Sequence, residues 1–142
     1  MSPTIYKAGM KEKKWLAESA DQKLRFISDL GLGVIDWLEP TNGDRVLDVG
    51  CGDGVLAQRM ISRGCEVLGI DINESSLEIA RNSGVDAHLM NANDIAFNDE
   101  FSAVFSNATL HWFKDPTNVI QNVHRSLQEG GRFVGELGGF GN

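Results

Sequence analysis

The feature that most constrains the fold is an apolar segment, residues 45–49, that leads directly into a loop with glycine at every second position. The acid Asp48 stands inside this segment, and the loop glycines are Gly50, Gly52 and Gly54. Glycine has no Cβ, so such a loop can turn tightly and let the backbone approach a ligand closely. We therefore expect a strand, a ligand-binding turn and then a helix.

Short strands alternate with helices of about ten residues along the rest of the chain. The expected strands are residues 45–49, 66–70, 87–90, 101–106 and 132–137. The expected helices are residues 21–38, 55–63, 75–82 and a last one that opens at Pro116 and has its apolar face on Val119, Ile120, Val123 and Leu127. Gly31 and Gly33 predict a kink or break in the first helix, and Gly130 and Gly131 predict a turn before the last strand. The alternation predicts parallel strands joined by right-handed crossovers, which is an α/β fold.

Composition narrows the functional class. With 142 residues the chain has the size of one domain, and its formal net charge of −7 argues against a nucleic-acid partner. Cys51 and Cys65 have no CxxC or histidine pattern around them, so we expect reduced thiols and no metal site. No signal peptide core and no window of about 18 apolar residues occurs. We expect a cytoplasmic protein with no membrane partner, in which residues 1–20 form a flexible or helical extension.

The glycine loop by itself leaves two ligand classes open. Gly52, Gly54 and Ala57 formally satisfy a dinucleotide fingerprint, and Asp71 follows at a suitable distance along the sequence for a ribose contact. Asp48, however, would repel the pyrophosphate of a dinucleotide. A ligand that carries an ammonium and a sulfonium group, and no phosphate, has the right sign of charge.

Five segments together resemble the class I S-adenosylmethionine-dependent methyltransferases. They are the glycine loop and residues 69–72, 89–97, 101–112 and 127–136. The motif Ser-Asn-Ala-x-Leu-His-Trp in the fourth segment is typical of the branch that includes trans-aconitate methyltransferases. The resemblance covers residues 22–142. It implies a doubly wound, Rossmann-like parallel sheet in the order 3-2-1-4-5 after a helical N-terminal segment, with S-adenosylmethionine as cofactor.

The same resemblance implies the roles of individual residues. The glycine loop would approach the methionine and ribose portions of the cofactor, Asp48 would bind the ammonium group and Asp71 both ribose hydroxyls. Ile72 would pack on the adenine, and Asn91, which stands where the family often has aspartate, can still accept a hydrogen bond from the adenine amino group. The expected cofactor-binding residues are Asp48, Gly50, Cys51, Gly52, Gly54, Asp71, Ile72, Asn91, Ala92 and Asn107.

The implied activity is methyl transfer from S-adenosylmethionine to a small molecule. A carboxylate acceptor needs no general base, whereas a hydroxyl or amine acceptor would use His111 as the candidate catalytic base. Simpler roles stay open for the acids, because Asp48 could be a turn residue and Asp71 a helix cap. Two other functions also stay open: a non-catalytic cofactor-binding protein and a nicotinamide-dependent oxidoreductase.

The sequence ends directly after the fifth expected strand, whereas the family usually has two further strands. An open edge along residues 132–137 would invite association with another strand. We therefore expect either the N-terminal part of a longer enzyme, or a single cofactor-binding core of residues 1–142 that covers this edge. The cover would be a homodimer or a folded-back tail.

Overall fold

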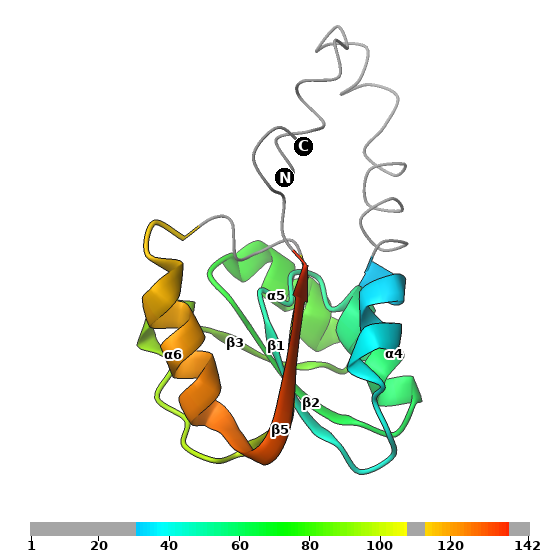
Figure 1. Cartoon of the computed structure of the whole chain (residues 1–142). Helices are drawn as coiled ribbons and strands as arrows, with labels where there is room; N and C mark the ends of the chain where they lie inside the picture. The colour runs from blue at the N-terminus through cyan, green and yellow to red at the C-terminus, as the bar shows by residue number, and fades with distance from the viewer. Residues whose placement is uncertain (1–30, 108–112, 137–142) are drawn as a thin grey trace, which may run out of the picture.

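The five strands form one parallel sheet. The computed structural model describes residues 31–107 and 113–136, and within these residues the strand order is β3-β2-β1-β4-β5, with every neighbouring pair parallel (Figure 1). This confirms the predicted fold class and strand order. The order reverses at β1, which lies between β2 and β4, and ligands of open α/β sheets bind where the order reverses.

The elements follow the predicted alternation. The strands are β1 (Arg45–Val49), β2 (Glu66–Asp71), β3 (Asp86–Leu89), β4 (Phe101–Asn107) and β5 (Leu127–Glu136). The helices are α4 (Val55–Ser62), α5 (Glu74–Asn82) and α6 (Pro116–Ser126), with a short 3-10 turn η1 (Ala92–Asp94), and residues 31–38 are helical as well. None of the helices described is long and apolar enough to cross a lipid bilayer.

Helices cover both faces of the sheet and make two hydrophobic cores. The first core joins the sheet to residues 31–38, α4 and α5 through side chains such as Leu38, Met60 and Leu77. The second joins it to η1 and α6 through Ile95, Phe101 and Val119. Successive residues of β1 alternate between them: Val46 belongs to the first and Leu47 to the second. This two-sided burial makes β1 a fully covered central strand.

The structure corrects several of the expected boundaries. β5 starts at Leu127, which therefore belongs to the strand and not to the apolar face of α6. Phe101 of β4 pairs with Leu127, but Ala103 already pairs with Arg132, so the ladder is irregular between these pairs. Gly130, with a φ of 78°, lies in that irregular stretch. The two glycines thus interrupt the pairing of a strand instead of making a turn before it.

The other boundaries differ by one residue. β2 and β4 each extend one residue further, to Asp71 and Asn107, so both side chains belong to strand ends. β3 is shifted one residue earlier, α5 starts one residue earlier and α4 ends one residue earlier than expected. The helix of residues 31–38 continues through Gly33 without a break. The predictions for residues 1–20, for the first part of the helix 21–38 and for the last residues of the chain lie outside the described residues.

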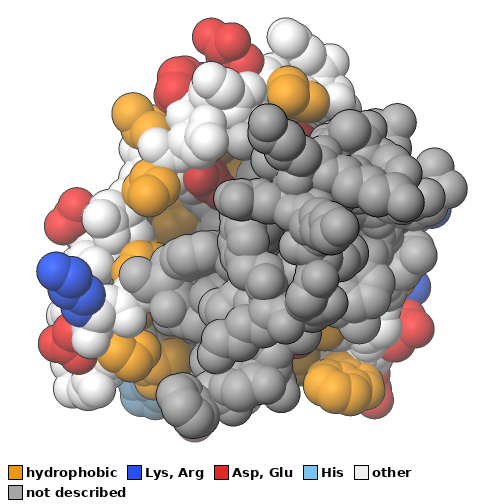
Figure 2. All heavy atoms as spheres, turned by 90° about the horizontal axis from the view of Figure 1, so that it is seen from above, with side chains coloured by type: hydrophobic (Ala, Val, Ile, Leu, Met, Phe, Trp, Pro, Cys, Tyr) orange, Lys and Arg blue, Asp and Glu red, His pale blue; other side chains and the backbone are white. Residues whose placement is uncertain are grey.

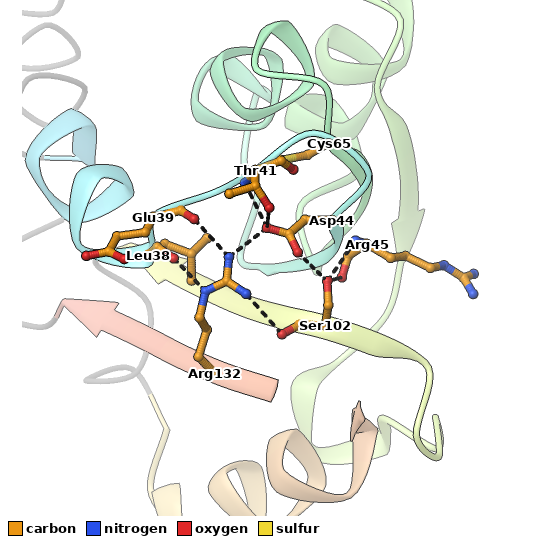
Figure 3. Close-up of polar contacts among 8 residues, drawn as sticks. All are labelled: Leu38, Glu39, Thr41, Asp44, Arg45, Cys65, Ser102 and Arg132. Carbon is orange, nitrogen blue, oxygen red and sulfur yellow. Dashed lines mark hydrogen bonds and ion pairs between the residues drawn. The ribbon is translucent and has the colours of Figure 1, made fainter. Parts of the chain in front are cut away.

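A polar network closes the amino edge of the sheet. The Arg132 guanidinium donates to the carbonyls of Leu38 (2.6 Å) and Glu39 (3.0 Å) and to the Asp44 carboxylate (2.6 Å) (Figure 3). Asp44 also accepts from the Ser102 hydroxyl at 2.9 Å. The Arg132 contact, more than any other, holds the pKa of Asp44 far below its ordinary value. The network thus joins β5, β4, the start of β1 and the helix before it, at the edge opposite to the glycine loop.

Candidate ligand-binding site at the carboxyl edge

The loop after β1 is shaped by three glycines in the left-handed region. Their φ angles are 78° at Gly50, 55° at Gly52 and 84° at Gly54. The loop is anchored to β2 because the backbone N–H groups of Gly50 and Cys51 both donate to the Ile70 carbonyl, at 2.8 and 2.9 Å. Residues with a Cβ rarely adopt these angles, so the chain needs glycine at these positions for its backbone path alone.

Two of these glycines differ in what surrounds them. Among the residues that the structure describes, a Cβ at Gly52 would meet nothing within 4 Å, so they leave space beside this residue. A Cβ at Gly54 would lie 3.0 Å from both the Ala80 Cβ and a Val85 methyl carbon. Gly54 is therefore required by the packing of the loop against α5 and against Val85, the residue before β3, whereas Gly52 leaves room for a ligand.

Asp71 links the end of β2 to the glycine loop. One carboxylate oxygen accepts the backbone N–H of Gly52 at 2.9 Å, and the other accepts that of Asn73 at 2.9 Å. An ionised carboxylate has about four lone-pair sites, so two further donors can still be bound. The capping of α5 falls to Asn73, whose side chain accepts from Ser76. Asp71 thus holds the loop directly and keeps acceptor capacity at the edge of the sheet.

Asp48 is a buried carboxyl group beside the loop. It is 2% exposed, on the strand where the sheet order reverses. Within the residues that the structure describes, no donor hydrogen-bonds to its carboxylate. Burial, and secondly the negative charge of Asp71, raise the pKa of Asp48 to about 7. A buried carboxyl group without a partner is costly to ionise, and a cationic ligand would supply the missing charge.

The segment after β3 supplies the third side of the site. Asn91 caps η1, and its side-chain oxygen accepts both the backbone N–H (2.9 Å) and the side-chain amide (3.2 Å) of Asn93. A bond from an adenine amino group to the same oxygen would therefore replace the side-chain contact with Asn93. Ala92 is buried, and Ile72, directly after β2, is 71% exposed. An apolar side chain so exposed at a strand end is available to pack on a flat ring.

The remaining predicted residues have different surroundings. The Cys51 thiol is buried in the first core against Gly69, where an added Cβ would lie 2.7 Å from the sulfur. Burial and the charges of Asp48 and Asp71 raise the pKa of this thiol, which keeps it protonated and unreactive. Asn107 ends β4 at the same edge of the sheet. The predicted base, His111, lies outside the described residues.

Three further residues at this edge were missed by the sequence reasoning. Ser106 is fully buried and donates to the Val49 carbonyl at 3.0 Å, which joins the ends of β4 and β1. Leu89, paired with Asp71 across β2 and β3, is 59% exposed. Asn122 of α6 is buried and donates to the carbonyls of Ala92 and Asn93. Only Asn122 had a visible signal, because a polar residue interrupts the apolar spacing of its helix.

The site therefore gathers acidic and apolar groups at the carboxyl edge. Figure 2 looks down onto the upper end of the molecule in Figure 1, toward which the arrow of β5 points, and acidic and hydrophobic side chains lie next to each other on its visible rim. No group of three metal-binding side chains occurs among residues 31–107 and 113–136. An acidic site with an open glycine and an exposed apolar side chain fits a ligand that combines positive charge with a flat ring.

Comparisons with known proteins agree with this geometry. The model of a methyltransferase domain family matches residues 47–135. An uncharacterized methyltransferase of Schizosaccharomyces pombe is 36% identical over 94% of this chain and 55% of its own length. A ubiquinone biosynthesis O-methyltransferase of Paracidovorax citrulli is 37% identical over 82% of this chain and 53% of its own length. The chain thus spans about half the length of the curated relatives it matches.

Solved structures give the same result. An S-adenosylmethionine-dependent methyltransferase from Mesorhizobium loti has a TM-score of 0.69 at 28% identity, over 72% of this chain and 50% of that protein. Phosphoethanolamine N-methyltransferase 2 of Haemonchus contortus, solved with S-adenosylmethionine, has a TM-score of 0.73 at 25% identity, over 77% of this chain and 28% of that protein. With the sheet order and the glycine loop, these matches show that the chain belongs to the class I S-adenosylmethionine-dependent methyltransferases.

Proposed function

We propose that this chain binds S-adenosylmethionine at the carboxyl edge of its sheet and contributes the cofactor half of a methyltransferase that acts on a small molecule. One observation carries the proposal: two acids from neighbouring strands flank the glycine loop, the loop-bound Asp71 and the buried Asp48, which has no hydrogen-bonding partner among residues 31–107 and 113–136. The cofactor carries two cationic groups, an ammonium and a sulfonium. A site with two carboxylates supplies negative charge that attracts these cations.

Each part of the cofactor has a proposed partner in the chain. The ammonium group would pair with Asp48 and relieve the cost of its buried charge. The ribose hydroxyls would donate to the acceptor sites of Asp71 that Gly52 and Asn73 leave open. The adenine would pack on Ile72 with its edge near Asn91 and Ala92, and the methionine portion would lie along Gly50 and the open side of Gly52. Asn107 would complete this set from the end of β4.

Methyl transfer from a sulfonium is a direct displacement, in which the acceptor attacks the methyl carbon along the line opposite to the sulfur. S-adenosylmethionine would supply a methyl carbon on a sulfonium group that departs with the electron pair of the broken carbon–sulfur bond, so the chain would mainly hold the two reactants in line in a dry site. A carboxylate acceptor brings its own electron pair. A hydroxyl or amine acceptor has a proton to lose, and His111 is the proposed base for that case.

Two measurements test the proposal. Calorimetric titration of the full chain with S-adenosylmethionine, S-adenosylhomocysteine and NAD should give binding of the first two only, because the buried carboxyl group of Asp48 opposes a pyrophosphate. Binding of NAD alone would instead support a nicotinamide-dependent oxidoreductase. A transfer assay with carboxylate, phenol and amine acceptors then separates an enzyme from a protein that only binds the cofactor.

We further propose that the protein partner of this chain is a second copy of itself, bound along β5. Within the described residues β5 is an outer strand of the sheet, bonded to β4 on one side. An outer strand with unused backbone donors and acceptors can pair with a second copy. Sedimentation of the full chain should then show a dimer at micromolar concentration, and a monomer at all concentrations would contradict this pairing.

A further inference from the structure

One face of α6 is polar although it is turned toward the protein. Asn118, Asn122 and Arg125 follow each other at helical spacing, and all three reach the loop of residues 91–95, here called the 91–95 loop. Asn122 is 4% exposed. A buried side-chain amide is costly unless its donors and acceptor are used, so a buried asparagine at this position calls for a specific explanation.

The hydrogen-bond partners of Asn122 fix the orientation of its side-chain amide. Its amide nitrogen donates to the carbonyls of Ala92 at 3.1 Å and Asn93 at 3.0 Å, and its oxygen accepts from Arg125 at 2.6 Å. Arg125 can only donate and the two carbonyls can only accept, so the amide cannot turn over. The same guanidinium nitrogen of Arg125 also donates to the Ile95 carbonyl at 3.1 Å.

The contacts continue from the loop backbone to Asn91. Asn118 donates to the carbonyl of Asn93 at 3.3 Å and to its side-chain oxygen at 3.0 Å. Asn93 in turn donates its backbone N–H and its side-chain amide to the Asn91 oxygen. The position and orientation of Asn91, the proposed contact to the purine edge, are therefore set through Asn93 from α6.

We propose that Asn122 is a positioning residue of the cofactor site, which holds the 91–95 loop at the distance from β2 that lets Asn91 and Ala92 read the edge of the purine. This inference rests on the proposed function. Asn122 itself contacts no ligand. Its effect is on the discrimination between purines, because the 91–95 loop is the part of the proposed site that meets the purine edge while Asp48, Asp71 and the glycine loop hold the rest of the cofactor.

The test compares two ligands that differ only at the purine edge. S-adenosylhomocysteine has an amino group at position 6, and S-inosylhomocysteine has a carbonyl oxygen there and a proton on the neighbouring ring nitrogen. A variant that merely lowers the folded fraction weakens both ligands by the same factor, so the ratio of their dissociation constants stays constant. A displaced 91–95 loop weakens the binding of S-adenosylhomocysteine more than that of S-inosylhomocysteine. It thereby lowers the ratio, taken as the dissociation constant of S-inosylhomocysteine divided by that of S-adenosylhomocysteine.

The first variant is Asn122→Asp, which keeps the size of the side chain and the contact with Arg125 but turns an oxygen toward two carbonyls. We expect the affinity for S-adenosylhomocysteine to fall about tenfold and the ratio to fall about fivefold, as for the loss of two hydrogen bonds. Asn122→Ala is the second variant, should the first fail to fold. Gln121→Ala, an exposed neighbour on α6, is the matched control and should change neither affinity.

Each outcome has one meaning. A lower ratio in a folded Asn122 variant supports the positioning role. An unchanged ratio, or a wild-type chain that does not distinguish the two ligands, overturns it while leaving the proposed function intact. A wild-type chain that binds neither ligand overturns the proposed function and this inference with it.

Discussion

The Asp71 carboxylate accepts the backbone N–H of Gly52 at 2.9 Å, although 19 positions separate the two residues in the sequence. The bond joins the end of β2 to the turn after β1, and it places an acid and an open glycine on the same side of the sheet edge. A proposed ribose-binding group is thereby a structural support of the loop as well. Substitution of Asp71 should consequently affect both ligand affinity and loop order.

Asp71→Ala should weaken S-adenosylhomocysteine binding about a hundredfold, on the order of 3 kcal/mol, because charge-assisted bonds to two ribose hydroxyls are lost. Calorimetric titration of the two chains measures the difference. Glu78→Gln, which removes one negative charge from the exposed side of α5, is the control for net charge and should bind normally. Unchanged affinity in Asp71→Ala would remove this residue from the site.

Gly52→Val should abolish cofactor binding and leave the fold in place. Valine resists a φ of 55° at a cost of about 1–2 kcal/mol, and its side chain would fill the open space beside the loop. Circular dichroism should show unchanged secondary structure while titration shows no binding. Normal binding by this variant would make the loop a structural turn only.

Gly54→Val is the matched contrast to that substitution. Here the added carbon atoms meet Ala80 and Val85 in the first core, so the variant has overpacking in the core in addition to the strain of the left-handed backbone. The melting temperature of Gly54→Val should be lower than that of Gly52→Val. Equal melting temperatures would contradict the division of roles between the two glycines.

Affinity for S-adenosylmethionine should rise about tenfold between pH 6 and pH 8. The ionised fraction of Asp48 increases about tenfold across a pKa of about 7, and only the ionised group attracts the ammonium. Titrations at several pH values test this against Asp48→Asn, whose affinity should be lower at pH 8 and should lack this rise. The same slope in both chains would assign the pH dependence to another group.

The raised pKa of Asp48 also makes a prediction for the ligand-free chain. A folded-state pKa above the unfolded value of about 3.9 means that the folded state holds its proton longer, so stability is lost as pH rises toward 7. The stability of Asp48→Asn relative to wild type should therefore increase from pH 5 to pH 8, by on the order of 2 kcal/mol. Urea unfolding at the two pH values measures this difference.

Arg132→Ala should lower the free energy of unfolding by about 1–3 kcal/mol, because the carbonyls of Leu38 and Glu39 lose this donor and the Asp44 carboxylate loses its ion pair. The pKa of Asp44 is depressed, so its contribution is present above about pH 4 and is lost as pH falls below that value. The difference between Arg132→Ala and wild type should shrink accordingly in acid. Arg59→Ala, which removes an exposed arginine of α4, is the control, and an equal loss in both would contradict the network.

Much of the fold was predictable because the relevant signals are local. The apolar run before Gly50 and the helical spacing around Val119 and Val123 depend on a few consecutive residues, and signals of this kind predicted β1 to β4 and α6 within a residue or two. The predicted start of β5 was wrong, because a turn was predicted at Gly130 and Gly131 and the strand only from Arg132, whereas it starts at Leu127. Glycine pairs normally signal turns, but here the pairing of Leu127 with Phe101 holds the chain in the sheet before the glycines are reached. That contact is not visible in the local sequence.

The candidate acids, the glycine positions and the parallel α/β class were predictable from the chain alone, because they depend on residue type and spacing. The surroundings of these residues come from tertiary packing. It buried Asp48 without a hydrogen-bonding partner among the described residues, left space at Gly52 but none at Gly54, and turned the Cys51 thiol into the core. It also brought Asn122 of α6 to the carbonyls of the 91–95 loop. Burial, left-handed backbone and long-range hydrogen bonds arise when distant segments pack together, so residue spacing alone does not encode them.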